Sequence, residues 1–252
     1  FYFYCFFSYL LGNINSFKET CIYLFMKGVL VILDGVGDLP NSQLDGKTPL
    51  DVAEMPNLDF LATRGEMGFM YTVKPGYTPG SDEAIVSMFG NKLISSTRGQ
   101  LEATGAGIQL KRGDLALRDN FATVDSFKQR TIGDRRAGRT LTTKEAEIFA
   151  KAINKIKLPV KFVFEPTVQH RGVLVFRGGF SDNISGNDPN PPNGKFKLCK
   201  PLDDEENAQY TANMLNEFLA QVYDVLDSHP VNEERRKKGL GSAEEAAGGP
   251  IQ

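Results

Sequence analysis

The sequence predicts an α/β protein in which a parallel-sheet core is followed by a separate α+β module. Residues 28–33 form a continuous apolar run that ends in the glycine-rich stretch 34–38, as expected of a buried parallel strand and its loop. Helical segments follow as far as Gly90, in the order typical of a layered α/β sheet. Beyond residue 97 the strands and helices no longer alternate strictly, which favours a second module.

Two helices are predicted in the core half. Pro56–Ala62 resembles a capped helix that stops near Gly65, with Asn57 as the cap. Ser81 begins a second short helix, which Gly90 ends because glycine accepts the left-handed conformation that commonly follows a helix.

The second module is predicted to contain strands at 115–124, 161–164 and 172–176. Thr142 and Glu145 have the three-residue spacing of a capping box, so a helix should begin there. The apolar side chains that this helix would place on one face are Ile148, Phe149, Ala152, Ile153 and Ile156.

A long helix is predicted from about Asp204 to Asp227, and Pro230 bars its continuation. Its expected buried face consists of Ala208, Thr211, Leu215, Phe218, Leu219, Val222 and Leu226. Residues 181–194 are rich in Gly, Pro, Asn and Asp and are expected to form a long loop.

The two ends of the chain differ from the rest. The apolar stretch 1–11 is shorter than the roughly 20 residues that a membrane helix needs. Met26 is interpreted as the natural start, which makes residues 1–25 an extraneous or disordered arm; the alternative is a membrane-associating or partner-binding arm. The tail 233–252 is charged and then glycine-rich, and is predicted to be disordered.

Composition excludes several classes of protein. The hydrophobic fraction of 41% is ordinary for a soluble protein, and the net charge of -2 does not favour nucleic acid as a partner. Cys5, Cys21 and Cys199 are widely spaced and include no C-x-x-C pair, so neither a disulfide framework nor a thiolate zinc site is indicated. A reducing cytoplasm is the simplest compartment, and no membrane partner is expected.

Asp34 and Ser81 are the first candidates for chemistry. A carboxylate at the end of a parallel strand points into the crevice where α/β proteins bind ligands, and a hydroxyl at a helix N-terminus lies where anions are favoured. A metal shared by the two residues would activate the hydroxyl, which indicates metal-assisted phosphoryl transfer. The alternatives are a loop aspartate capping its own turn and a plain N-cap serine.

The second candidate is a cluster of arginines. Arg135, Arg136 and Arg139 lie within five residues and follow Asp134, while Arg118 and the pair His170-Arg171 belong to the same module. Guanidinium groups match phosphate and carboxylate bidentately, so a phosphorylated carboxylic acid would suit the cluster. The alternative is a solvated basic turn.

These motifs resemble the archaeal-type 2,3-bisphosphoglycerate-independent phosphoglycerate mutases of the alkaline phosphatase superfamily. The similarity extends from Met26 to about Arg236. Its motifs are residues 34–38, 46–50, 56–59, 79–82, 99–103, 105–108, 118–123, 134–139, 170–172, 181–183 and 229–233.

The resemblance implies a partial alkaline-phosphatase-like parallel-sheet core, residues 26–97, with an inserted substrate-binding α+β domain, residues 98–232. It implies interconversion of 3-phosphoglycerate and 2-phosphoglycerate in glycolysis and gluconeogenesis through a phosphoserine. Two divalent metals, Mn, Mg or Zn, hold the site in the family. The family's early metal-ligand aspartate falls on Asp34 and its phosphorylated serine on Ser81.

The substrate residues that the resemblance implies are Asp134, Arg135, Arg136, Arg139, Arg118 and His170. The family's late metal ligands lie in an Asp-His pair, an Asp-x-x-x-His segment and a further histidine, but this sequence contains no Asp-His pair. One aspartate and one serine supply too few ligands for two divalent metal ions. The chain is therefore interpreted as a C-terminally truncated fragment with little or no mutase activity alone and a tendency to aggregate.

Two other readings stay open. One is a related metal-dependent phosphotransferase or phosphatase with another acidic phosphoester as substrate. The other is a non-catalytic module that uses the arginine cluster to bind a phosphorylated acid. The sequence predicts no oligomeric state.

Overall fold

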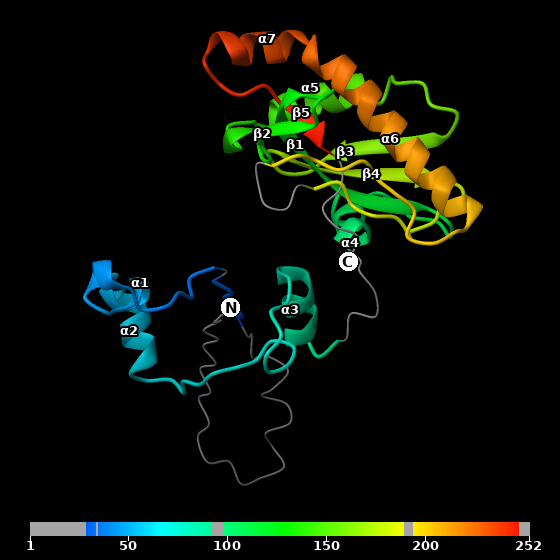
Figure 1. Ribbon diagram of the computed structural model, residues 1–252. Coiled ribbons are helices and arrows are strands. Elements are labelled where there is room, and N and C mark those ends of the chain that lie inside the picture. Colours follow the sequence, from blue (N-terminus) through cyan, green and yellow to red (C-terminus); the bar gives the residue numbers. More distant parts are fainter. Residues whose placement is uncertain (1–28, 34, 92–97, 189–193, 247–252) are drawn as a thin grey trace. The chain divides into compact units, whose positions relative to one another are not determined.

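The computed structural model describes residues 29–33, 35–91, 98–188 and 194–246 (Figure 1). The chain divides into two compact units, an N-terminal unit of residues 1–93 and a C-terminal unit of residues 94–252. The predicted mixed α/β class is confirmed. No helix within these described ranges is both long and apolar enough to cross a membrane.

The N-terminal unit contains short helices. They are η3 (Ser42–Leu44), α1 (Pro49–Val52), α2 (Pro56–Ala62) and α3 (Ser81–Met88). The predicted helices α2 and α3 are confirmed, and Gly90 after α3 has the expected left-handed φ of 78°. The predicted cap of α2 is wrong: Met55 is the N-cap residue and makes no side-chain cap hydrogen bond, while Asn57 lies inside the helix.

The predicted buried strand at residues 28–33 is not formed by residues 29–33. These residues have no strand pairing, and Val29 is 81% exposed. A parallel strand is buried only when neighbouring strands take up its backbone hydrogen bonds and helices cover its faces. Within 29–33 and 35–91 there is no strand to do so, although an isolated bridge joins Asn41 and Lys47.

The C-terminal unit is built on an antiparallel sheet of order β2-β1-β4-β3, with β5 also paired to β1. The strands are β1 (Leu115–Ser126), β2 (Thr131–Asp134), β3 (Lys161–Pro166), β4 (Arg171–Arg177) and β5 (Glu244–Ala246). The helices are α4 (Arg98–Gly105), η4 (Ala137–Arg139), α5 (Thr143–Ile153), α6 (Glu206–Asp227) and α7 (Pro230–Lys237). The three predicted strands are β1, β3 and β4, whereas β2 and β5 were not predicted.

Side-chain alternation along the strands divides the core between two faces of the sheet. Leu117 of β1 and Leu174 of β4 join a large cluster that includes buried side chains of α5 and α6. Val173 and Val175 point the other way and pack with Ala103 of α4. Figure 1 shows the same arrangement, with α5 and α6 on one side of the sheet and α4 on the other.

The two long helices largely follow their predicted patterns. Thr142 and Glu145 form the capping box of α5: the Glu145 backbone N–H donates to Thr142 Oγ1 at 3.3 Å, and Thr142 Oγ1 donates to the carboxylate at 2.7 Å. Ile148 departs from the expected apolar face because it is 43% exposed, while Ala146 and Ala150 are buried instead. All seven residues of the predicted face of α6 are buried.

The prediction of a disordered tail from residue 233 is wrong for residues 233–246. Residues 233–237 complete α7, in which Asn232 and Arg235 are buried, and residues 244–246 form β5 against β1. Composition suggested disorder because the segment is charged and then rich in small residues and glycine. Its order comes instead from polar side chains that hydrogen-bond the backbone, including Asn232 to Ala243.

Candidate functional site

Ser81 lies in the first turn of α3 and is exposed. Gly80, not Ser81, is the N-cap residue, and its backbone N–H donates to the Glu83 carboxylate at 3.1 Å. The Tyr77 hydroxyl donates to the same carboxylate at 2.9 Å, which raises the pKa of Tyr77. The alternative of a plain N-cap serine is therefore wrong, and the side chain of Ser81 lies at the accessible N-terminal end of the helix.

The predicted partnership of Ser81 with Asp34 cannot be read from the geometry, because Asp34 lies outside the described residues. Within the described ranges, no three or more His, Cys, Asp and Glu side chains lie close enough together to hold a metal ion. A dication needs about four to six donors, so Ser81 would hold one only together with ligands from outside its described surroundings.

The C-terminal unit brings most of the predicted arginines to one place. Arg118 belongs to β1, Arg135 and Arg136 lie between β2 and η4, and Arg139 is the last residue of η4. His170 occupies the turn between β3 and β4 and is only 7% exposed.

Burial and the charges of nearby arginines set the charge state of His170. Burial first, and then the nearby charges of Arg171, Arg136, Arg139 and Arg118, together lower the pKa of His170 to about 4. The imidazole is thus neutral near pH 7, and its buried Nδ1 has no hydrogen-bond partner among the described residues. The charges of four arginines therefore act on a neutral, polar ring.

The arginine loop, residues 134–139, has an unusual backbone. The Asp134 carboxylate accepts the Arg136 backbone N–H at 2.7 Å, so this aspartate shapes the loop from within. Ala137, Gly138 and Arg139 then have φ values of 46°, 63° and 54°. Only glycine adopts this left-handed region without cost, and each other residue there costs about 1–2 kcal/mol. Such strain persists only where surrounding contacts impose it, and it concentrates at functional sites.

Acidic side chains bracket the cluster without neutralising it. Arg135 forms an ion pair with Asp188, whose pKa is raised by burial although Arg135 and Arg136 oppose that effect. The Arg118 Nε atom lies 3.8 Å from a carboxylate oxygen of Glu102, and Thr167 Oγ1 donates to the other oxygen at 2.6 Å. Among the contacts described above, the five arginines, counting Arg171, outnumber the carboxylates Glu102, Asp134 and Asp188.

Sequence reasoning missed part of this neighbourhood. Arg171 was visible as the residue after His170 but was not assigned a role, and its charge acts on His170 more strongly than the others. Asp188 and Glu102 gave no signal because their partners are distant in the sequence. The cluster as a whole has the composition and charge of a site for an anion that carries phosphate or carboxylate groups.

The family model for 2,3-bisphosphoglycerate-independent phosphoglycerate mutase matches residues 62–232. The chain belongs to this family. The matched range contains Ser81, His170 and the arginine loop, and so includes every predicted site residue except Asp34. Members of this family are isomerases, and the family name states that they act independently of 2,3-bisphosphoglycerate.

Curated mutases from archaea are close in sequence. The "2,3-bisphosphoglycerate-independent phosphoglycerate mutase 1" of Archaeoglobus fulgidus is 45% identical over 221 residues, covering 85% of this chain and 53% of that protein. The mutase of Thermococcus kodakarensis is 45% identical over 219 residues, covering 84% and 51%. The chain therefore spans about half the length of the curated mutases it matches.

Two solved structures share the fold. The cofactor-independent phosphoglycerate mutase of Thermoplasma acidophilum has a TM-score of 0.54 and 36% identity, covering 86% of this chain and 58% of that one. The PH0037 protein of Pyrococcus horikoshii has a TM-score of 0.58 and 30% identity, covering 87% and 49%.

Proposed function

We propose that this chain carries the phosphoryl-accepting serine and the substrate-binding arginines of a mutase that interconverts 3-phosphoglycerate and 2-phosphoglycerate. One observation supports the proposal most directly: four arginines lie near enough to His170 for their charges to act on its neutral imidazole, inside the range that the family model matches. A phosphoglycerate carries two anionic groups, and planar guanidinium groups bind both phosphate and carboxylate bidentately.

Ser81 is proposed as the phosphoryl acceptor. In the forward half-reaction the bond between phosphorus and the substrate oxygen breaks, and a bond from phosphorus to Ser81 Oγ forms. The proton that the serine hydroxyl loses goes to the substrate oxygen that is released. The glycerate then reorients, and the phosphoryl group returns to the other hydroxyl, which restores Ser81.

The arginine cluster has a separate role, which is to hold the glycerate while the phosphoryl group is on the enzyme. Arg136, Arg139 and Arg118 are the proposed anchors, with Arg135 already paired to Asp188. Neutral His170 can donate or accept one hydrogen bond to the substrate without adding to the positive charge. Asp134 stays a predicted substrate residue, and its contact with the Arg136 backbone supports a role in shaping the loop.

The metal requirement of the proposal rests on the resemblance. Asp34 and Ser81 are the residues of this chain proposed to contribute to a site for two divalent ions, which would supply charge neutralisation when bound. The expectation of little turnover by these 252 residues alone also stays a prediction. A coupled assay for 2-phosphoglycerate, run with and without manganese, tests both.

Calorimetric titration of the full chain with 3-phosphoglycerate tests the binding role. Replacing Arg136 or Arg139 by Gln removes a charge-assisted hydrogen bond worth about 1.5–3 kcal/mol, so binding should weaken about 10- to 100-fold. Arg112→Gln is the matched control, because it removes the same charge from an exposed position of the same unit. Equal affinity in all three variants would refute the assignment of the cluster.

A second function, a binding module without turnover, is favoured by one observation. The arginine cluster lies wholly within the C-terminal unit, whereas Ser81 belongs to the N-terminal unit. Tight binding of 3-phosphoglycerate that does not depend on manganese, with no phosphate found on Ser81 by peptide mass spectrometry, would support this module. Phosphate on Ser81 that is lost in Ser81→Ala would support the mutase.

A further inference from the structure

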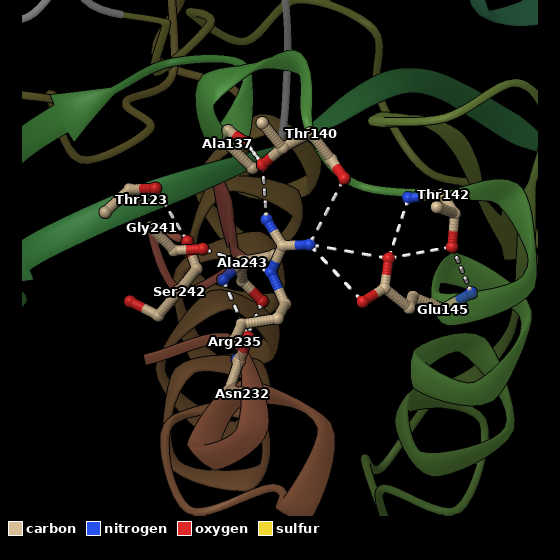
Figure 2. Close-up of polar contacts among 10 residues, drawn as sticks. All are labelled: Thr123, Ala137, Thr140, Thr142, Glu145, Asn232, Arg235, Gly241, Ser242 and Ala243. Carbon is tan, nitrogen blue, oxygen red and sulfur yellow. Dashed lines mark hydrogen bonds and ion pairs between the residues drawn. The ribbon is translucent and has the colours of Figure 1, made fainter. Parts of the chain in front are cut away.

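The segment that follows α6 is fastened to the body of the C-terminal unit by polar contacts. We name residues 229–246 the C-terminal clasp. The Asn232 side chain donates to the carbonyl oxygens of Leu226 and Ala243 at 2.8 and 3.0 Å and accepts the Ala243 N–H at 2.8 Å. Thr123 Oγ1 of β1 donates to the Ser242 carbonyl at 2.6 Å. Figure 2 shows the contacts of Asn232 with Ala243 and of Thr123 with Ser242, and next to them the separate contacts of a second side chain of the clasp, Arg235.

Arg235 is 1% exposed, and arginine is rarely buried so deeply unless its charge and its donors are satisfied. Its Nε donates to the Gly241 carbonyl at 3.0 Å, and Nη2 donates to Thr140 Oγ1 at 2.9 Å. Its Nη1 lies 3.4 Å from the Thr140 carbonyl and from both carboxylate oxygens of Glu145. The guanidinium group thus joins the clasp to a segment about 95 residues earlier in the chain.

Glu145 is the acidic partner that keeps this buried charge in place. Burial alone would raise its pKa, but hydrogen bonds from Thr142 and the charge of Arg235 hold the pKa below its ordinary value. Glu145 stays ionised at neutral pH for that reason. Its carboxylate both closes the capping box of α5 and contacts Arg235, so two independent sets of contacts hold the side chain in place.

Thr140 carries the connection from Arg235 into the arginine loop. Its hydroxyl accepts from Arg235 and donates to the Ala137 carbonyl at 3.0 Å, and its backbone N–H donates to the same carbonyl at 3.2 Å. Ala137 is fully buried and is the first of the three left-handed residues that end at Arg139. A strained turn of this kind relaxes unless its neighbours hold it, and Thr140 is a neighbour that does so through two hydrogen bonds to the Ala137 carbonyl.

We propose that Arg235 is a positioning residue that acts through Thr140 to hold the arginine loop in the conformation that presents Arg136 and Arg139 to an anion. The proposal rests on the function proposed above for that cluster. It makes docking of the clasp and binding of the anion thermodynamically coupled, so that each strengthens the other. A site built from arginines early in the unit is thereby controlled by residues more than ninety positions later in the sequence.

Four variants of the full chain separate positioning from folding. Arg235→Gln removes the guanidinium group. Thr140→Val removes only the Thr140 hydroxyl, which links the guanidinium group of Arg235 to the Ala137 carbonyl. Thr140→Ser keeps that hydroxyl and is the conservative rescue. Arg236→Gln removes the same charge one residue later, at a side chain that is 41% exposed and pairs with Asp227.

The primary measurement is affinity for 3-phosphoglycerate by calorimetry, at a temperature where each variant is folded. Loss of one strong hydrogen bond in the chain of contacts should weaken binding by about tenfold in Arg235→Gln and Thr140→Val. Thr140→Ser and Arg236→Gln should stay within about twofold of the unsubstituted chain. Folded Thr140→Val with unchanged affinity would overturn the proposal. If Arg235→Gln does not fold, the affinities of Thr140→Val and Thr140→Ser are compared instead, and equal affinities would overturn the proposal.

A second measurement keeps this inference separate from the proposed function. The backbone amide shifts of residues 137–139 are followed by NMR without ligand and then with inorganic phosphate. Amide shifts that change in Arg235→Gln and Thr140→Val, but not in Arg236→Gln, support the positioning role. This holds even if the unsubstituted chain does not bind 3-phosphoglycerate, a result that would refute only the proposed function. Unchanged shifts in both linking variants would refute the positioning role.

Discussion

Asn232→Ala tests whether the clasp is an ordered part of the protein. The Asn232 side chain is fully buried and makes three hydrogen bonds, two of them to the backbone of Ala243. The Leu226 carbonyl keeps a partner after the substitution, because it also accepts the His229 N–H at 3.1 Å. The N–H and carbonyl groups of Ala243 lose the partner that Asn232 provides.

The magnitude follows from these two backbone groups. A buried group left without its hydrogen bond costs about 1–3 kcal/mol, so the substitution should lower the free energy of unfolding of the C-terminal unit by about 2–4 kcal/mol. With a urea m-value of about 2 kcal/mol/M, the unfolding midpoint should fall by about 1–2 M.

Urea unfolding followed by circular dichroism provides the assay, and hydrogen exchange at the Ala243 amide provides its local counterpart. Asn213→Ala is the control: this asparagine is exposed on α6, and alanine has the higher helix propensity, so the midpoint should stay or rise slightly. A midpoint for Asn232→Ala within the error of the control, with unchanged exchange at Ala243, would refute the account of the clasp.

Three further predictions concern other parts of the C-terminal unit. A Cβ at Gly99 would lie 1.9 Å from the Ala116 carbonyl oxygen, so Gly99→Ala should displace α4 and cost about 1–3 kcal/mol or more in a thermal melt, whereas Gly105→Ala, which meets nothing within 4 Å, should not. The folded pKa of His170, about 4, lies below its ordinary value of 6.5, so the unfolded chain binds more protons between these values. His170 should therefore add to stability fully above pH 6.5 and lose this contribution as the pH falls toward 4; a pH series of urea midpoints should show a shallower acid decline in His170→Gln, and an equal decline would contradict the shift. Burial raises the pKa of the Cys199 thiol to about 11, so iodoacetamide at pH 8 should alkylate it far more slowly in the folded chain than in urea, as peptide mass spectrometry would show.

Local sequence signals predicted the elements that local physics controls. The capping box at Thr142 and Glu145, the apolar stripe of α6 and the three strands of the second module all appear where expected. The predicted strand at 28–33 failed because a run of apolar residues becomes a strand only with hydrogen-bonding neighbours, and the described part of its unit has none.

The candidate site was predicted only in part, because some of its contacts join neighbours along the chain and others join distant segments. The sequence indicated that Arg135, Arg136 and Arg139 form a cluster suited to a phosphorylated acid, and the structure places them in a loop that has consecutive left-handed residues. Spacing could not indicate that Arg171 and His170 would meet this loop, or that Asp188 would neutralise Arg135, because those contacts join different strands and loops. The part of the prediction that concerns Asp34 lies outside the described residues.

The sequence by itself determined the family, the helices with strong periodicity and the residue types available for an anion site, since motifs and amphipathic patterns are properties of neighbours along the chain. The tertiary structure decided which arginines gather around His170 and what holds their loop. Arg235 lies in a charged stretch, beginning at residue 233, that composition alone marks as disordered, and Asn232 lies directly before it. They are ordered because backbone groups from other parts of the fold accept and donate their hydrogen bonds, and in a buried environment those bonds are costly to lose.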